Sequence, residues 1–319
     1  MIARTLGKSD LSVSAIGLGT MSWPGTGFGV SEAASEYAPV LEMVRTALEC
    51  GVTFFDTAEG YGRGLAETLL GRALEELGAR HRSVIVSKVG PLFEEEKIDG
   101  RGCNLSKAHV LTRCEASLRR LRTDRIDLYL AHWPDPVTPI EETLEAAETL
   151  RAQGKIRWFG VSNFSAELLS AALTAGSVVA NQLPYSLVDR DIDADRRPFC
   201  LQRQVGIMAY SPLGKGVLSG KYNASHLPPA DDYRHQRKHF AKENLPRHLA
   251  IAAKVRELAP QCGCTPAQLA MAWAIAQPGI TVILPGAKSV EQVRANAAAA
   301  EVRIPADVMT ELDAVSRLE

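Results

Sequence analysis

The sequence lacks the features that would assign it to a membrane, to secretion or to nucleic acid. No apolar run approaches the roughly 20 residues of a membrane-spanning helix, and the first residues lack the basic-then-apolar pattern of a signal peptide. The 36 Lys and Arg residues nearly balance the 37 Asp and Glu residues, and the net charge is −1. This balance offers no basic surface for nucleic acid or for an acidic membrane, so we expect neither as a partner.

A disulfide framework is also missing. Most of the six cysteines lie inside apolar-periodic stretches, at Cys50, Cys103, Cys114, Cys200, Cys262 and Cys264. One residue separates Cys262 from Cys264, and no second ligand pair accompanies them, so the spacing does not fit a zinc site. This usage predicts a reduced, cytoplasmic chain without a metal.

What is present is an ordinary globular composition. Hydrophobic residues make up 46% of the 319 residues and charged residues 23%, which argues against disorder. The length fits two domains or one large α/β barrel. Because no linker, low-complexity tract or charge block divides the chain, we expect one domain over residues 1–319.

Short apolar runs alternate with longer segments of helical period. Eight runs read as buried parallel strands, at residues 15–18, 53–56, 84–88, 126–132, 156–161, 178–182, 206–210 and 281–284. Helices are expected at residues 40–50, 67–77, 107–121, 140–153, 166–175, 194–203, 247–259, 265–276 and 290–300. Parallel strands need helical crossovers, so eight such units predict a (β/α)8 TIM barrel.

Three segments fall outside this repeat. Residues 2–13 alternate around Gly7 and predict a β-hairpin that caps the barrel floor. Residues 211–246 are rich in Gly, Pro and charge, as binding loops or lids are. Their basic run at 234–239 fits a solvated lid face or a cofactor clamp through Arg234. Residues 305–318 predict an extra C-terminal helix.

Four titratable residues follow consecutive strands of the expected barrel. Asp56 ends one strand and Tyr61 follows it, while Lys88 and His132 end the next two. Each alone has a structural explanation, as a helix cap, a packed ring or a solvated charge. In a barrel of this kind, however, the carboxyl ends of the strands meet at one mouth, where active sites form.

Together these residues can deliver a proton to a carbonyl oxygen. A tyrosine titrates near ~10 and needs its phenolate stabilised, which the Lys88 ammonium would do. Asp56 would keep that lysine charged, and His132 would stabilise the developing alkoxide. The set contains no nucleophile and no metal, so hydride must come from elsewhere.

At this point the sequence resembles the aldo-keto reductases. The matching blocks lie at residues 17–20, 54–62, 67–74, 87–90, 127–134, 154–164, 209–213 and 216–221. The resemblance implies an NADPH-dependent reductase of aldehydes or ketones that works through Asp56, Tyr61, Lys88 and His132. It implies a small-molecule carbonyl as partner and leaves the substrate and the oligomeric state open.

The resemblance also implies a site for NADPH. Ser162, Asn163 and Gln182 would hold the nicotinamide carboxamide, and Tyr210 would stack on its ring. The remaining expected contacts are Thr20 and Met21 beside the ribose, Ser211, Leu213, Gly216 and Lys221 at the pyrophosphate, and Gly286, Lys288, Ser289, Gln292 and Asn296 at the adenosine and its 2′-phosphate. Asp56 is also expected to contact the cofactor. Trp23, Phe93 and Trp133 would line an apolar substrate pocket. Ala66, Val290 and Ala295 depart from the family pattern, the last two in the adenosine block.

Other motifs and functions were weighed against this one. The spacing of Gly25, Gly27 and Gly29 misses the dinucleotide fingerprint, and the segment is expected to be a loop. A barrel similar to potassium-channel β subunits would bind NADPH without catalysis, but such barrels tend to lose the histidine that is present here as His132. A lyase using Lys88 as a Schiff base would leave Tyr210 and Gln182 unexplained.

Overall fold

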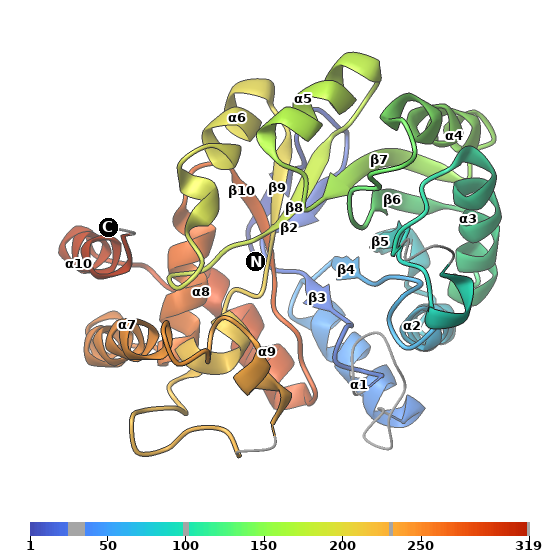
Figure 1. Cartoon of the computed structure of the whole chain (residues 1–319). Coiled ribbons are helices and arrows are strands. Elements are labelled where there is room, and N and C mark those ends of the chain that lie inside the picture. Colours follow the sequence, from blue (N-terminus) through green and yellow to red (C-terminus); the bar gives the residue numbers. More distant parts are fainter. Residues whose placement is uncertain (25–35, 98–101, 230–231, 318–319) are drawn as a thin grey trace.

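Eight parallel strands form the barrel wall in the computed structural model, which describes residues 1–24, 36–97, 102–229 and 232–317 (Figure 1). They are β3 (Leu18–Gly19), β4 (Phe54–Asp56), β5 (Val84–Val89), β6 (Ile126–Ala131), β7 (Ile156–Ser162), β8 (Ala180–Pro184), β9 (Gly206–Tyr210) and β10 (Ile280–Leu284). Each pairs with its sequence neighbour. The Gly17 and Gly19 N–H groups donate to the carbonyls of Ile283 and Pro285, at 2.9 and 3.1 Å, and so close the barrel. The (β/α)8 prediction is confirmed.

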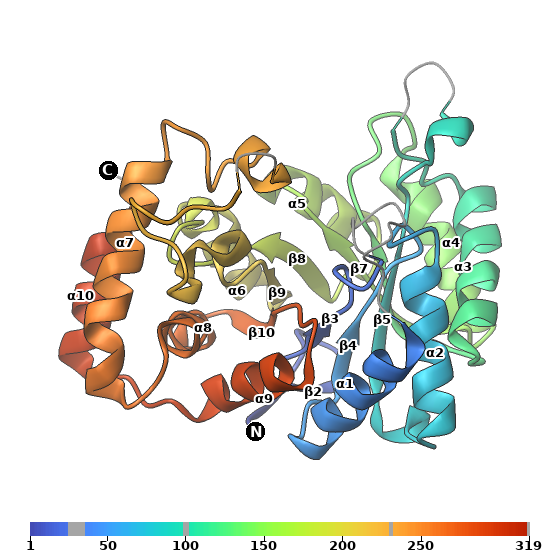
Figure 2. The same cartoon turned by 90° about the horizontal axis from the view of Figure 1, so that it is seen from below.

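The helices surround this barrel (Figure 2). They are α1 (Tyr37–Glu49), α2 (Leu65–Glu76), α3 (Lys107–Leu121), α4 (Ile140–Ala152), α5 (Ala166–Ala175), α6 (Arg196–Arg203), α7 (Leu245–Leu258), α8 (Pro266–Ala276), α9 (Val290–Ala298) and α10 (Ala306–Ser316). Their apolar faces and the outward side chains of the strands form one buried layer. The expected C-terminal helix is α10, which lies beside α7 (Figures 1 and 2). None of the helices in the described part of the chain has the length and apolar content that crossing a membrane requires.

The N-terminal hairpin closes one end of the barrel. Strands β1 (Ala3–Thr5) and β2 (Ser12–Ser14) are antiparallel, as predicted. Leu6, Leu11 and Val13 join the cluster of side chains that fills the barrel interior. At the turn, Gly7 has φ +54°, and a Cβ there would lie 2.3 Å from the Val179 carbonyl, so only glycine fits. The opposite end, at the carboxyl ends of the strands, is the one left for chemistry.

Several element boundaries differ from those expected. The first barrel strand is Leu18–Gly19 rather than 15–18, because the hairpin continues to Ser14. Helices α1 and α7 begin two to three residues early, since proline is compatible with the first turn, as Pro246 shows in α7. The loop at 211–246 contains short 3₁₀ turns at Gly214–Ser219 and Tyr233–Gln236. The glycine-rich loop expected at 25–29 lies outside the described residues.

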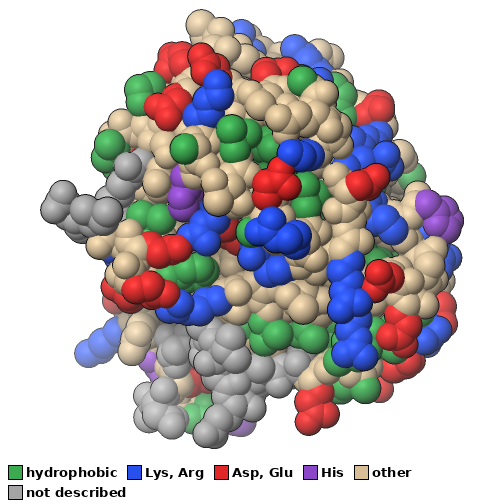
Figure 3. All heavy atoms as spheres, turned by 90° about the vertical axis from the view of Figure 1, so that its right-hand side faces the viewer, with side chains coloured by type: hydrophobic (Ala, Val, Ile, Leu, Met, Phe, Trp, Pro, Cys, Tyr) green, Lys and Arg blue, Asp and Glu red, His purple; other side chains and the backbone are tan. Residues whose placement is uncertain are grey.

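The outer face over α2, α3 and α4 carries charges of both signs (Figure 3). Lysines and arginines gather there and pair with carboxylates, as in Arg122–Glu75 at 2.6 Å and Lys107–Glu145 at 3.0 Å. On this face the charges of both signs are interspersed rather than separated into acidic and basic surfaces.

Candidate active site

The alternation of side chains along the strands brings polar groups to the mouth of the barrel. In β5, Val86 belongs to the interior cluster and Lys88, two residues further on, faces the same way. In β6, Leu128 and Leu130 fill the interior, and His132 follows at the same spacing. The apolar barrel interior thus ends in a layer of titratable side chains at the carboxyl ends of the strands.

Lys88 is fully buried and surrounded by acceptors. Its Nζ donates to Asp56 Oδ1 at 2.7 Å and to the Thr57 carbonyl at 2.7 Å. A third bond joins Nζ to the Tyr61 hydroxyl at 3.2 Å. Burial lowers the pKa of Lys88, and the Asp56 carboxylate opposes this effect. Three acceptors match the three protons of an ammonium group, so the site holds a charged lysine.

Asp56 is also bound on its second oxygen. Gln182 Nε2 donates to Asp56 Oδ2 at 2.7 Å, from β8 on the far side of the barrel mouth. The Asp56 carbonyl accepts from the Thr20 N–H at 3.0 Å, which ties β4 to the end of β3. The carboxylate therefore holds both Lys88 and Gln182 in place.

Tyr61 places its hydroxyl on this charged pair. Burial raises the pKa of the phenol well above its usual value, and the Asp56 carboxylate adds to the rise. The ring meets His132 edge to face, with centroids 5.7 Å apart. At neutral pH the phenol is protonated and lies next to an ammonium that would stabilise its anion.

His132 completes the group as a neutral ring. Burial lowers its pKa well below the usual value, and the nearby Lys88 charge lowers it further. Trp133 stacks beside it at 6.5 Å and is 45% exposed. Tyr61 and His132 are therefore both uncharged at neutral pH.

Three of the residues expected at the nicotinamide lie together beside this cluster. Asn163 has a left-handed backbone, with φ +64°. Its Nδ2 donates to the His132 carbonyl at 3.1 Å, and its Oδ1 accepts from the Tyr210 hydroxyl at 2.9 Å. Ser162 Oγ accepts from the same Nδ2 at 3.0 Å. The network links β6, β7 and β9 at the mouth of the barrel.

The segment after β9 has an unusual backbone. Ser211, Gly214, Lys215 and Gly216 all have positive φ, and that of Gly216 reaches +100°. Leu213 accepts at its carbonyl from the N–H groups of Gly216 and Leu218, at 2.9 and 3.2 Å. The segment is a tight turn that directly follows Tyr210, while Lys221 is exposed beyond it.

The residues expected at the adenosine end gather where α9 begins. Ser289 caps the helix by accepting from the Gln292 N–H at 3.3 Å, and Gln292 Oε1 accepts from the Lys288 N–H at 2.9 Å. Asn296 Nδ2 donates to the Gly286 carbonyl at 3.2 Å. Lys288 is exposed at this N-terminus, where a phosphate would be stabilised.

The residues expected near the ribose and the substrate differ in how deeply they are buried. Thr20 is fully buried, and its Oγ1 has no hydrogen-bond partner in the described part of the chain. Met21 is 37% exposed beside it. Trp23 is completely buried in the layer between barrel and helices. Phe93 lies between the guanidinium groups of Arg63 and Arg113, at 4.7 and 5.8 Å.

The long loop after β9 is fastened to the loop after β8. Asp189 is buried and accepts from His239 and Lys238, and these partners hold its pKa below the usual range although burial raises it. Arg234 is bound by Asp232 at 2.6 Å and lies over the Tyr222 ring at 5.2 Å. The same guanidinium would lie 3.8 Å from a Cβ at Gly216. Arg234 thus borders the turn that follows Tyr210.

Sequence reasoning missed three participants in this site. The Thr57 carbonyl and the Asp56–Gln182 bond depend on strand curvature, for which the sequence carries no signal. Asp189 lies in the loop after β8, five residues beyond Pro184, and no sequence pattern marks it.

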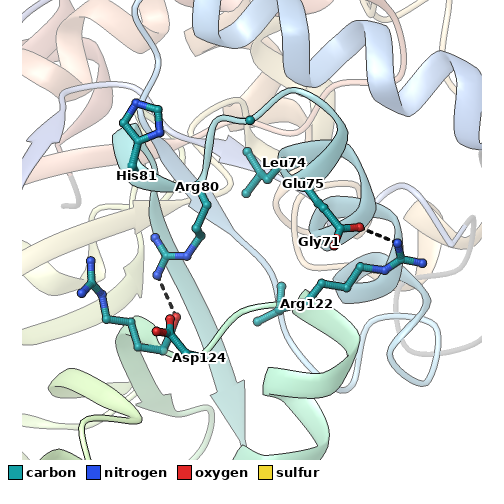
Figure 4. Close-up of a pocket in the computed structure, with 10 residues that line it drawn as sticks. Gly71, Leu74, Glu75, Arg80, His81, Arg122 and Asp124 are labelled. Atoms are coloured by element: carbon teal, nitrogen blue, oxygen red, sulfur yellow. Dashed lines mark hydrogen bonds and ion pairs between the residues drawn. The ribbon is translucent and has the colours of Figure 1, made fainter.

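A hollow on the opposite end of the barrel does not belong to this site. It lies between α2 and α3, next to Arg80 and His81, which precede β5 (Figure 4). Arg122 points toward Glu75 and bonds it at 2.6 Å, and Arg80 bonds the Arg125 carbonyl at 2.7 Å. Arg122 and Glu75 compensate each other's charge there, and the titratable cluster described above is at the other end.

Comparisons with known proteins agree with this geometry. The model of the aldo/keto reductase family matches residues 15–317. Aldo-keto reductase YhdN of Bacillus subtilis is 32% identical over 292 residues, which cover 91% of this chain and 86% of that protein. The glycerol dehydrogenase AKR11B4 of Gluconobacter oxydans is 29% identical, with a TM-score of 0.87 over 98% of this chain and 94% of that one. An aldo/keto reductase of Klebsiella pneumoniae, solved with NADP and acetate, is 34% identical, with a TM-score of 0.74 over 96% and 92% of the two chains. This chain belongs to the aldo/keto reductase family.

Proposed function

We propose that this protein reduces an aldehyde or ketone to the alcohol with NADPH, and that Tyr61 donates the proton to the carbonyl oxygen. The observation that carries the proposal is the contact of the Tyr61 hydroxyl with Lys88 Nζ at 3.2 Å, on a lysine that Asp56 holds. A protonated phenol beside a fixed ammonium is a proton donor whose anion is stabilised in advance.

The residues at the mouth fit the cofactor. Asn163, Ser162 and Gln182 offer amide and hydroxyl groups for a carboxamide, and Tyr210 offers an aromatic face beside them. The buried Thr20 Oγ1 lacks a partner in the described structure, and exposed Lys288 suits a phosphate. NADPH supplies the hydride when bound. The related Klebsiella pneumoniae enzyme, solved with NADP, supports the same cofactor here.

Each catalytic side chain has one task in the proposed reaction. As the carbonyl carbon is reduced, negative charge grows on its oxygen, and Tyr61 transfers its hydroxyl proton there. Lys88 stabilises the phenolate that remains, and Asp56 keeps the ammonium oriented. The phenolate then regains a proton from water. The alcohol leaves with one proton from Tyr61.

In the proposed reaction His132 acts as a neutral hydrogen-bond donor and transfers no proton. Because burial and Lys88 keep its pKa well below the usual value, the ring is neutral at pH 7 and donates a hydrogen bond to the carbonyl oxygen. The neutral ring stabilises the developing alkoxide, and the proton itself comes from Tyr61.

A Schiff base on Lys88 is disfavoured by the same geometry. Imine formation needs a neutral amine with a free electron pair that reaches a carbonyl carbon. All three bonds of Lys88 Nζ lead to acceptors, and the side chain is fully buried. The lysine is thus suited to charge stabilisation.

We infer a single catalytic domain in a reducing, cytoplasmic compartment, acting on a small carbonyl compound. All six cysteines are free thiols. The exposed Trp133 ring next to His132 supports an apolar substrate, for which Phe93 would add further surface, whereas the fully buried Trp23 would not.

The test combines binding and turnover. Purified protein is titrated with NADPH by tryptophan fluorescence and then assayed with a panel of aldehydes and ketones by NADPH oxidation. We expect binding and turnover of at least one class. Binding without turnover of any carbonyl would favour a regulatory barrel similar to the potassium-channel β subunits, and absence of binding would overturn both.

A further inference from the structure

Glu59 is a buried carboxyl group that the proposed reaction does not use. It lies between Asp56 and Tyr61 in the loop from β4 to α2 and is 1% exposed. Its Oε1 accepts from the Gly90 N–H at 3.4 Å, and its Oε2 lies 3.7 Å from Arg113 Nε. Oε2 has no hydrogen bond within the described residues. A buried carboxyl group with so few hydrogen bonds is uncommon and needs a physical explanation.

The contacts of Glu59 join the two segments that carry the catalytic pair. Gly90 follows β5, two residues after Lys88. The Glu59 N–H lies 3.5 Å from the Lys88 carbonyl, so main chain and side chain both connect the Tyr61 loop to this strand. Arg113 belongs to α3, which packs outside β5 and β6 (Figure 1). Glu59 therefore ties the position of Tyr61 to that of Lys88.

The surroundings of Glu59 contain groups of both signs. The positive charges are Arg113 and Arg120, but Arg120 is bound by Glu67 at 2.6 Å and Arg113 is shared with Glu96. The other facing groups are Glu67, Cys114 and Tyr129, from α2, α3 and β6. Burial raises the pKa of Glu59 to about 7, with Arg113 opposing and Glu67 adding to the rise.

We propose that Glu59 is a positioning residue whose ionised form holds the segment of Tyr61 against the strand of Lys88. The proposal rests on the proposed function. The carboxylate accepts from Gly90 and attracts Arg113, and both contacts weaken when it is protonated. Displacement of a reacting group by less than an ångström lowers rates substantially, so loosening this tie reduces turnover without touching the cofactor site.

The pH dependence of turnover should report the ionisation of Glu59. Neither Tyr61 nor His132 titrates near neutral pH, because the pKa of Tyr61 lies well above this range and that of His132 well below it. Burial lowers the pKa of Lys88 and the Asp56 carboxylate opposes this, so the Glu59→Gln variant decides which group the inflection belongs to. With a pKa of about 7, the ionised fraction of Glu59 falls from about 0.9 at pH 8 to about 0.1 at pH 6. We expect kcat of the wild type to fall by up to about tenfold over this interval.

Three variants test the proposal. Glu59→Gln should lower kcat at pH 8 and abolish the inflection, while the Kd for NADPH stays within about twofold of wild type. Arg113→Gln removes the cation that opposes the rise in the pKa of Glu59, so the inflection in the pH profile of kcat should move to higher pH. Glu96→Gln is the control, because it also removes a contact of Arg113, but Glu96 does not contact Glu59. The inflection should remain in this variant. An unchanged profile in Glu59→Gln overturns the proposal.

A second measurement needs no turnover and so separates this proposal from the proposed function. Tyrosine rings are labelled with ¹³C in the free protein, and the Tyr61 signal is assigned with Tyr61→Phe. In the wild type this signal should shift with a midpoint near pH 7, and in Glu59→Gln it should not. If the protein reduces no carbonyl but this shift is seen, the positioning role stands and the proposed activity fails. If the Tyr61 signal does not respond to pH, the positioning role is wrong whatever the activity.

Discussion

Gln182 Nε2 lies 2.7 Å from Asp56 Oδ2, and this bond spans the barrel mouth from β8 to β4. The other oxygen of the same carboxylate holds Lys88 at 2.7 Å. One buried carboxylate therefore holds the ammonium beside Tyr61 and also orients an amide expected at the cofactor. Loss of Asp56 should affect the whole mouth of the barrel.

Asp56→Asn should strongly destabilise the protein. The substitution leaves the Lys88 ammonium buried without its counter-charge, which costs about 3–5 kcal/mol in unfolding free energy. Urea denaturation followed by circular dichroism measures this loss. The matched control is Glu95→Gln, because Glu95 pairs with Arg63 where both side chains are more than half exposed. The control should leave stability nearly unchanged, because solvent screens an exposed ion pair. Equal effects of the two variants would contradict the role of the buried pair.

Tyr61→Phe should remove the proton donor while leaving the rest of the site in place. We expect kcat to fall by about 10²- to 10⁴-fold, with the Kd for NADPH within about twofold of wild type. Tyr129→Phe is the control, since Tyr129 is a buried tyrosine of β6 whose hydroxyl has no hydrogen-bond partner in the described structure. That variant should keep wild-type turnover. A Tyr61→Phe enzyme with more than about a tenth of the wild-type kcat would show that another group supplies the proton.

Lys288→Ala should weaken NADPH and leave NADH almost unchanged. A charged hydrogen bond to the 2′-phosphate contributes about 1.5–3 kcal/mol, which corresponds to a roughly 10- to 100-fold change in Kd. Lys221→Ala, expected at the pyrophosphate, should weaken both cofactors alike. Fluorescence titration of each variant with each cofactor gives the four Kd values. Loss of both cofactors to the same extent in Lys288→Ala would contradict the 2′-phosphate assignment.

His132 should make the folded protein sensitive to acid. Its pKa is lowered on folding, so the unfolded chain binds more protons below its own pKa of about 6.5. Its contribution to stability is full above that pH and is lost as the pH falls further, by up to about 1.4 kcal/mol per pH unit.

The comparison with His132→Gln isolates this effect. His248, whose pKa burial also lowers, and Glu59, whose raised pKa acts in the opposite sense, are present in both proteins. Urea unfolding between pH 5 and 7.5 should show wild type losing stability relative to the variant below about pH 6.5. A constant difference across this range would mean that folding does not lower the pKa of His132.

The sequence predicts the barrel and its catalytic group because both depend on periodic patterns. Alternation along β5 and β6 puts Lys88 and His132 on the inner face, and the chain order of parallel strands makes them neighbours. Such information is local, since each run of residues carries its own period.

The remaining parts of the site depend on distances that no local pattern contains. The bond from Gln182 to Asp56 links residues 126 positions apart and requires the curvature of the closed barrel. Glu59 reads from the sequence as one more loop carboxylate, and its burial becomes visible only when α3 is packed beside the loop. The start of α7 differs from the expected one for a different, local reason, because Pro246 resembles a loop residue but fits a first turn.

The seam between the first and last strands has a consequence for how this protein is made. A chain emerging from the ribosome can pair β3 with β4 early, but the second partner of β3, at β10, is synthesised more than 260 residues later. Until then the nascent sheet keeps two unpaired edges, which are prone to associate with other chains. Thr20 and Lys288 lie on opposite sides of this seam, so the expected cofactor site comes together only with the final strand. A chain interrupted before Ile280 would thus be a substrate for chaperones rather than a weakened enzyme.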